Sequence, residues 1–281
     1  MKLATLRVDN STVAARKDGD TYTVIEGYDN LNQLLANADW KTIAQQAADA
    51  QIAEDAADLA PVVPSPSKVL CVGLNYAGHI LEMGRELPEY PTVFPKFADT
   101  LTGPKDPVGA VEEDPDLDWE AELAIVIGKT AYKVAEEDAE EYIAGYTLAN
   151  DISMRGWQAR TIEWTQGKIW AKSTPVGPYM VTPDELDFDT AILRTTLNGN
   201  VMQEHQINDL VFKPAKLIEY LSTMLPLRPG DLILTGTPGG VGKGRTPALY
   251  MKAGDHVEVS LDGLGKISTD IVTPAEAPAV L

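Results

Sequence analysis

Strand-like segments recur through most of this chain, and helices do not alternate regularly between them. From residue 68 onward, short apolar runs end in Gly, Asp or Asn turns, at residues 68–76, 121–128, 141–151, 192–200, 231–240 and 255–272. Helical patterns stand at 151–166 and 214–224. A doubly wound parallel sheet needs a helix after almost every strand, so this pattern predicts an α+β, mostly β domain.

The first 60 residues have a different pattern. Two strand-like segments with Asp18-Gly19 in a hairpin turn precede an amphipathic helical pattern at 30–49. A proline-rich segment at 61–66 cannot be helical and predicts a linker. We therefore expect a small N-terminal α/β domain at 1–60 and a catalytic domain at 67–281.

Charge and cysteine content exclude several classes of protein. The formal net charge is −19 and no basic cluster offsets it, so binding to a nucleic-acid backbone is not expected. Cys71 is the only cysteine, which excludes a disulfide within the chain and fits a reducing compartment. The start lacks the apolar stretch of a signal peptide, and no run reaches the roughly 18 apolar residues of a membrane span. We expect a cytoplasmic protein without nucleic-acid or membrane partners.

Two apolar strands carry carboxylates at their ends. Side chains alternate along a strand, so Glu120 and Glu122 project from one face, and Asp151 ends the second apolar run. Three carboxylates brought together suit a hard cation such as Mg²⁺ or Mn²⁺ and leave open positions for a chelating substrate. The alternatives are a solvated strand end for the two glutamates and a helix N-cap for Asp151.

Further polar residues stand near these carboxylates or in a separate helical segment. Helical spacing after Asp151 places Arg155 and Gln158 on its face, where they could meet an anionic ligand. His79 and Glu82 are three residues apart and share a face of a short helix, so Glu82 could orient His79 as a base. The alternative for His79 and Glu82 is a surface pair in a loop.

Residues 234–244 are rich in glycine but do not form a P-loop. The spacing from Gly236 to Lys243 is one residue too long, and Gly244 stands where a Ser or Thr is required. What remains is a strand followed by a tight turn, whose backbone N–H groups and Thr237 could hold a carboxylate. The alternative is an ordinary loop.

Five motifs in this order resemble those of the fumarylacetoacetate hydrolase family: VGLNYAGHILEMG, WEAELAIVIG, YTLANDISMRGWQ, WAKS and GDLILTGTPGGVG. The resemblance covers about residues 67–272. It implies a mixed β-roll or β-sandwich-like catalytic domain, commonly in a homodimer. It also implies that Glu120, Glu122 and Asp151 bind Mg²⁺ or Mn²⁺.

The resemblance assigns further residues to catalysis and to the substrate. It implies that His79 and Glu82 form the catalytic dyad on a short lid helix. It places Lys172 of WAKS at the substrate, together with Gln158 and Thr237. Lys96 of VFPKF matches a recurrent lysine of the family, and two arginines could receive a distal carboxylate, namely Arg85 and Arg155.

Members of the family with this style of sequence act on 2-oxo acids, whose carboxylate and keto oxygens can chelate a metal. For a 2,4-dioxo acid, His79 would activate water to attack C4, and the C3–C4 bond would break to release an acid and pyruvate enolate. The dyad favours hydrolysis, so we expect an acylpyruvate or fumarylpyruvate-like substrate from the catabolism of aromatic compounds. The alternatives are an oxaloacetate decarboxylase, an isomerase or hydratase of oxo-dienoate acids, and a non-catalytic ligand-binding member of the fold.

Overall fold

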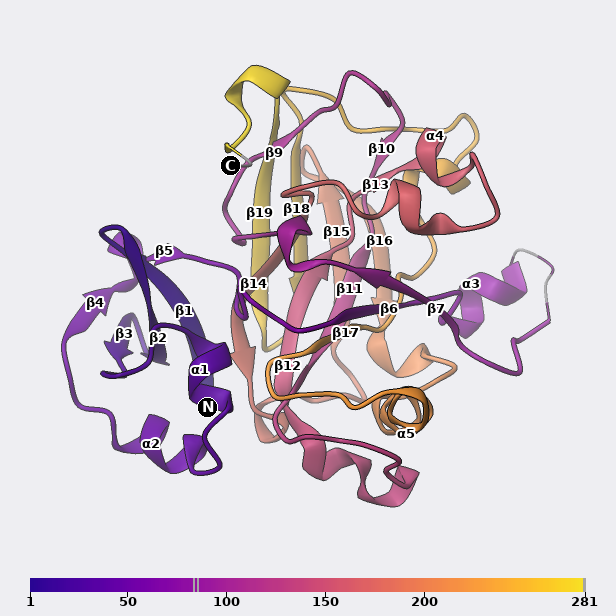
Figure 1. Ribbon diagram of the computed structural model, residues 1–281. Coiled ribbons are helices and arrows are strands. Elements are labelled where there is room, and N and C mark those ends of the chain that lie inside the picture. The colour runs from indigo at the N-terminus through magenta and orange to yellow at the C-terminus, as the bar shows by residue number, and fades with distance from the viewer. Residues whose placement is uncertain (83, 85, 280–281) are drawn as a thin grey trace.

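The structure is a computed structural model that describes residues 1–82, 84 and 86–279, with the backbone alone for His79 and Glu82. Within this part of the chain, two sheets form a sandwich (Figure 1). The larger sheet has twelve strands, in the order β4-β3-β2-β1-β14-β12-β11-β17-β6-β7, with β5 beside β1 and β8 beside β14. The smaller sheet has the order β16-β15-β18-β19-β9, and β10 pairs with β13. The predicted α+β, mostly β fold is confirmed.

The strands are β1 (Lys2–Val8), β2 (Ser11–Asp18), β3 (Thr21–Val24), β4 (Gln51–Ala53), β5 (Asp58–Leu59), β6 (Val69–Gly73), β7 (Thr92–Lys96), β8 (Leu101–Thr102), β9 (Val108–Gly109), β10 (Leu117–Asp118), β11 (Ala121–Ile127), β12 (Ile143–Asn150), β13 (Ser153–Met154), β14 (Thr174–Val181), β15 (Ile192–Leu197), β16 (Asn200–Gln206), β17 (Leu232–Leu234), β18 (His256–Leu261) and β19 (Gly265–Val272). The α-helices are α1 (Leu31–Leu35), α2 (Trp40–Gln46), α3 (Ala77–Glu82), α4 (Arg155–Gln158) and α5 (Pro214–Met224). No helix of the described residues is both long and apolar enough to cross a membrane.

Strand β11 lies in the core with both of its faces covered. Leu123 and Ile125 pack in a cluster with Val259 of the smaller sheet. Ala124 and Val126, on the opposite face, pack in a second cluster with residues of α1 and α2. Every residue of β11 and of its neighbour β12 is therefore buried, which explains why both strands are continuous apolar runs.

The first 60 residues extend the larger sheet. Strand β1 pairs antiparallel with β14, with Lys2 opposite Val181, and Figure 1 shows β1 to β5 with α1 and α2 on one side of the molecule. The hairpin predicted at Asp18-Gly19 joins β2 to β3, and Gly19 has a φ of 57°. The division into domains at 1–60 and 67–281, with a linker at 61–66, stays a prediction.

Two predicted helices differ from the structure. The pattern at 30–49 gives α1 and α2 in place of one helix, because Asn37 Oδ1 accepts a hydrogen bond from the Asp39 N–H at 2.9 Å, a local contact that competes with helical bonding. The pattern at 151–166 gives β13, the single turn α4 and a 3₁₀ turn at Trp164–Gly167. The helix predicted at 214–224 is confirmed as α5.

Candidate metal centre and active site

Strand pairing brings three carboxylates together. Strands β11 and β12 are antiparallel, with Ala121 opposite Asn150, so the start of β11 lies beside the end of β12. Glu120 and Glu122 flank Ala121, and Asp151 follows Asn150. One oxygen from each carboxylate lies within 4.8 Å of the others, and all three residues are buried. Asp151 is therefore not an N-cap, because α4 begins only at Arg155.

Two buried lysines lie against these carboxylates. Lys168 Nζ donates to Glu120 Oε2 at 2.5 Å and to Asp151 Oδ2 at 3.0 Å. Lys96 Nζ donates to Asp151 Oδ1 at 2.6 Å and to the Lys168 carbonyl oxygen. Removing one partner of a buried ion pair typically costs about 3 to 5 kcal/mol, so the lysines and acids hold one another in place.

Arg155 links the carboxylates to a fourth buried acid, Asp118. Arg155 Nη1 lies 2.7 Å from Glu120 Oε1 and donates to Gln158 Oε1 at 2.9 Å, while Arg155 Nε donates to Asp118 Oδ2 at 2.8 Å. Gln158 lies three residues after Arg155 on α4, which is the spacing that places both on one face. The predicted pair is thus adjacent, but Arg155 contacts Glu120, not Asp151.

Burial and neighbouring charges shift the pKa values of the carboxylates in the cluster. Burial raises the pKa of Glu122 well above its usual range, and the neighbouring carboxylates of Asp151 and Glu120 add to the rise. Burial also opposes ionisation of Asp151, but Lys168 and then Lys96 outweigh it and lower the Asp151 pKa. The charged form of Glu122 is therefore costly in this site, and a bound cation would stabilise it.

The glycine-rich turn closes over the same carboxylates. The Gly236 N–H donates to Glu122 Oε2 at 2.7 Å, and Gly236 has a φ of 104°, a left-handed conformation that favours glycine. The next residue, Thr237, lines the pocket. The turn is held by Gln203, whose Nε2 donates to the Pro238 carbonyl oxygen at 2.8 Å. Sequence reasoning missed Gln203, because it lies in β16 of the other sheet.

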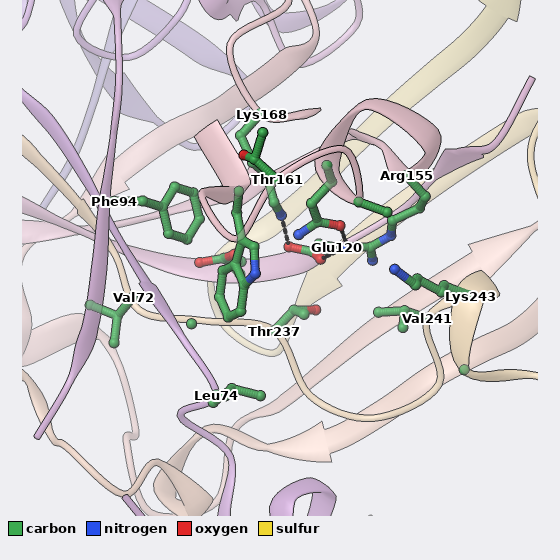
Figure 2. A pocket seen from close by; sticks show the side chains of 16 residues that line it. Val72, Leu74, Phe94, Glu120, Arg155, Thr161, Lys168, Thr237, Val241 and Lys243 are labelled. Carbon is green, nitrogen blue, oxygen red and sulfur yellow. Dashed lines mark hydrogen bonds and ion pairs between the residues drawn. The ribbon is translucent and has the colours of Figure 1, made fainter. Parts of the chain in front are cut away.

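Six of the residues described above line a cavity of about 380 Å³: Glu120, Glu122, Arg155, Gln158, Lys168 and Thr237. Figure 2 shows Val72, Leu74 and Phe94 along one side of it and Arg155 and Lys243 along the other, with Glu120 and Lys168 between them. The lining residues are Val72, Gly73, Leu74, Phe94, Glu120, Glu122, Arg155, Gln158, Ala159, Thr161, Trp164, Lys168, Thr237, Val241, Lys243 and Gly244. The volume suits a small molecule.

The donor set fits a divalent cation. Oxygen ligands at about 2.1 Å from an ion lie roughly 3 to 4 Å from one another, and the three carboxylate oxygens already fall within 4.8 Å. All three donors are hard carboxylates, without sulfur or imidazole, which is the set that Mg²⁺ and Mn²⁺ prefer. Glu120, Glu122 and Asp151 can therefore hold such an ion at one wall of the cavity.

Comparison with known proteins identifies the family. The family model described as fumarylacetoacetate (FAA) hydrolase C-terminal matches residues 68–272. The chain belongs to this family. Among relatives of the fumarylacetoacetate hydrolase family, the mitochondrial oxaloacetate tautomerase fahd2 of Xenopus laevis is 43% identical over 217 residues, which cover 76% of this chain and 68% of that protein.

Solved structures of the family agree over the whole fold. Fumarylacetoacetate hydrolase from psychrophilic Exiguobacterium antarcticum has a TM-score of 0.88 and 28% identity, and the match covers 97% of this chain and 99% of that one. Maleylpyruvate hydrolase from Sphingobium sp. SYK-6, solved in complex with manganese(II) ion and pyruvate, has a TM-score of 0.80 and 28% identity, over 97% and 99% of the two chains.

The predicted lysines lie in unexpected places. Lys172 is half-buried and lines a different cavity, together with Arg7 and Asp106. Lys168, which sequence reasoning missed, occupies the position between Glu120 and Asp151. The local signal for Lys168 is the preceding glycine: a Cβ on Gly167 would lie 2.5 Å from Gln158 Cβ, so the chain approaches α4 closely there. Lys96 touches Asp151 but does not line the cavity.

The predicted dyad is only partly described. His79 and Glu82 both belong to α3, as the helical spacing predicted, but their side chains lie outside the described part of the structure. Arg85 lies outside the described residues altogether. Their roles stay predictions.

Proposed function

We propose that this chain is a divalent-metal-dependent enzyme that enolises 2-oxo acids, with keto–enol tautomerisation of oxaloacetate as its principal reaction. The observation that carries the proposal is the convergence of three buried carboxylates within 4.8 Å, two of which, Glu120 and Glu122, line a small-molecule cavity. Support for the substrate comes from the relative of 43% identity, which is named an oxaloacetate tautomerase. Oxaloacetate was an alternative substrate expected from the sequence, but for decarboxylation and not for tautomerisation.

In the direction from keto to enol, a base takes a proton from C3, negative charge develops on the C2 oxygen, and that oxygen then takes up a proton; the reverse direction returns the proton to C3. A bound Mg²⁺ or Mn²⁺ would polarise the keto group and stabilise that charge. Lys168 would stabilise the same negative charge on the C2 oxygen. Its ammonium group has three N–H donors, and two of them contact Glu120 and Asp151. The third is available to the substrate, since Lys168 lines the cavity.

Proton transfer at C3 needs a base, and we assign it to His79. The assignment rests on the family resemblance and on the place of α3 in the chain, since Leu74 lines the cavity three residues before the helix begins. Glu82 would orient His79 through their three-residue spacing on α3. A general base typically contributes about 10²- to 10⁴-fold to a rate, so His79→Ala should lower turnover by that factor.

Hydrolysis of an acylpyruvate is the second candidate function. The solved maleylpyruvate hydrolase with manganese(II) and pyruvate favours it, because pyruvate is the chelating product that such a hydrolysis would release. Both reactions pass through an enolate at C2 and C3 of a 2-oxo acid. Tautomerisation forms it by loss of the C3 proton, whereas hydrolysis forms it by cleavage of the C3–C4 bond after water attacks C4. The homodimer and the cytoplasmic location expected from the sequence stay predictions beside these proposals.

The deciding experiment follows the ultraviolet absorbance of enol-oxaloacetate as it converts to the keto form. The protein is assayed with Mg²⁺, with Mn²⁺ and with a chelator, and the free ions and the Glu120→Gln variant correct for catalysis by metal alone. We expect a metal-dependent acceleration by the wild-type protein alone. Cleavage of an acylpyruvate without this acceleration would favour the second candidate, and no reaction of either acid would overturn both.

A further inference from the structure

Lys243 places a cation at the opening of the cavity. Its side chain is exposed to solvent and also lines the cavity, and Figure 2 draws it on the same side of the cavity as Arg155, opposite Val72. The chain as a whole carries a net charge of −19, which repels an anionic substrate. A cation at the opening of the cavity therefore offsets this repulsion locally and attracts anionic ligands.

The other cations near the cavity are matched by carboxylates. Arg155 is paired with Asp118 and Glu120, and Lys168 with Glu120 and Asp151. For Lys243, no carboxylate among the described residues lies within ion-pair distance. Among the cavity-lining cations that the structure describes, Lys243 is the one without a carboxylate partner, so its positive charge is not neutralised by a neighbouring acid.

Asp118 fixes the backbone of this lysine. Asp118 Oδ1 accepts from the Gly242 N–H at 2.6 Å, and Oδ2 accepts from the Lys243 N–H at 3.0 Å and from Arg155 Nε at 2.8 Å. The Gly242 backbone is also packed tightly, since a Cβ there would lie 1.8 Å from the Leu249 carbonyl oxygen. The lysine stem therefore starts from a set position relative to Arg155 and the carboxylates.

We propose that Lys243 binds the distal carboxylate of a 2-oxo dicarboxylic acid. The inference rests on the proposed function, in which the 2-oxo acid end of the substrate binds the metal ion that Glu120, Glu122 and Asp151 would hold. The far end of the substrate then contacts either the apolar side of the cavity, at Val72, Leu74 and Phe94, or the cationic side, at Arg155 and Lys243. A second carboxylate at the far end is attracted to the ammonium group of Lys243, so the site should bind diacids more tightly than monoacids of the same length.

The test compares binding of two acids that differ only at the far end, 2-oxoglutarate and 2-oxovalerate. Both are titrated by calorimetry in the presence of Mn²⁺ into the wild-type protein, Lys243→Met and Lys252→Met. Lys243→Met keeps the length of the side chain and removes its charge. Lys252→Met removes the same charge from an exposed position outside the cavity.

We expect the wild-type protein and Lys252→Met to bind the diacid more tightly than the monoacid. In Lys243→Met the diacid should bind roughly three- to thirty-fold more weakly, the range between an exposed ion pair and a charge-assisted hydrogen bond, with the monoacid unchanged. The KM for oxaloacetate should rise in parallel, with kcat nearly constant.

Three results would overturn the inference: equal binding of the two acids by the wild-type protein, binding of neither acid, or a diacid preference that survives in Lys243→Met. If the wild-type protein accelerates oxaloacetate tautomerisation in the same preparation, any of these results removes the role of Lys243 and leaves the proposed function standing. If the wild-type protein does not accelerate oxaloacetate tautomerisation at all, that separate result counts against the proposed function.

Discussion

Gln203 Nε2 donates a hydrogen bond to Thr237 Oγ1 at 2.9 Å, and this contact determines where the Thr237 hydroxyl proton can go. Gln203 Oε1 accepts from the Ala121 N–H at 3.1 Å, while Nε2 also donates to the Pro238 carbonyl oxygen. A backbone N–H only donates and a carbonyl only accepts, so the orientation of the amide is set. Thr237 must accept from Gln203, and its own proton is free to be donated into the cavity.

Thr237→Val should therefore weaken substrate binding. A hydrogen bond to a charged group typically contributes about 1.5 to 3 kcal/mol, and about 1.4 kcal/mol corresponds to a tenfold change, so KM should rise at least about tenfold. Thr237→Ser keeps the hydroxyl and should stay close to wild type. Steady-state kinetics on the three proteins gives the comparison, and equal KM values for the Val and Ser variants would remove the donor role of Thr237.

Lys168 and Lys172 provide a direct test of the lysine assignment. Lys168→Met removes the N–H that faces the substrate and the partner of Glu120 and Asp151, so turnover should fall by roughly 10² to 10³, as for loss of an oxyanion donor. Lys172→Met should keep nearly full turnover, because Lys172 lines a different cavity. If Lys172→Met lost as much turnover as Lys168→Met, the assignment made from the sequence would stand in place of the structural one.

The carboxylate cluster was predictable because its causes are local. Two continuous apolar runs predicted β11 and β12, and each carries acids at one end, so a single antiparallel pairing brings Glu120, Glu122 and Asp151 together. The amphipathic pattern of α5 was equally local. These predictions needed no knowledge of how distant segments pack.

The residues that were missed depend on packing between distant segments. Lysine is rarely buried, so the burial of Lys168, which was missed, follows only from the acids that the fold places beside it, as does the burial of Lys96, which was predicted from the family resemblance. Gln203, in β16 of the smaller sheet, contacts Thr237 in the turn that follows β17 of the larger sheet, and nothing near Gln203 in the sequence indicates this contact. The helix predicted at 151–166 is wrong for a similar reason. Contacts of this segment with the carboxylate cluster determine its backbone conformation, and they override its helical periodicity.

Glu122→Gln should change stability in opposite directions with and without metal. In a chelator, the amide removes the cost of a buried charge beside Asp151 and Glu120, and it can still accept from the Gly236 N–H. We expect the free energy of unfolding to rise by about 1 to 2 kcal/mol. Mn²⁺ should raise the melting temperature of the wild-type protein but not that of Glu122→Gln, because a ligand stabilises only the state that binds it.

Glu120→Gln is the matched control for this prediction. Glu120 is paired with Lys168 and Arg155, so its neutralisation should lower the melting temperature in the chelator. Differential scanning calorimetry with and without Mn²⁺ measures both effects. A lower melting temperature for both variants in the chelator would show that Glu122 does not carry the costly charge inferred here.

The ion pair between Arg7 and Asp106 should make stability depend on pH. It joins β1 to the segment after β8, with Arg7 Nη2 2.5 Å from Asp106 Oδ2. Burial opposes ionisation of Asp106, but hydrogen bonds from Arg7, Thr102 and the Gly103 N–H outweigh it and hold its pKa below the ordinary value of 3.8. A lowered folded-state pKa contributes stability that is present above the unfolded value and is lost as the pH falls through the folded value.

Asp106→Asn should therefore lower the free energy of unfolding by about 1.5 to 3 kcal/mol at neutral pH, and the difference from wild type should shrink as the pH falls below 3.8. Asp58, the other partner of Arg7, is exposed, so Asp58→Asn should cost only about 0 to 1 kcal/mol. Urea unfolding of the three proteins over a series of pH values measures this directly. A difference for Asp106→Asn that stays constant into the acid range would mean that its carboxylate charge does not hold β1 in place, and that the loss comes from the packing of the amide instead.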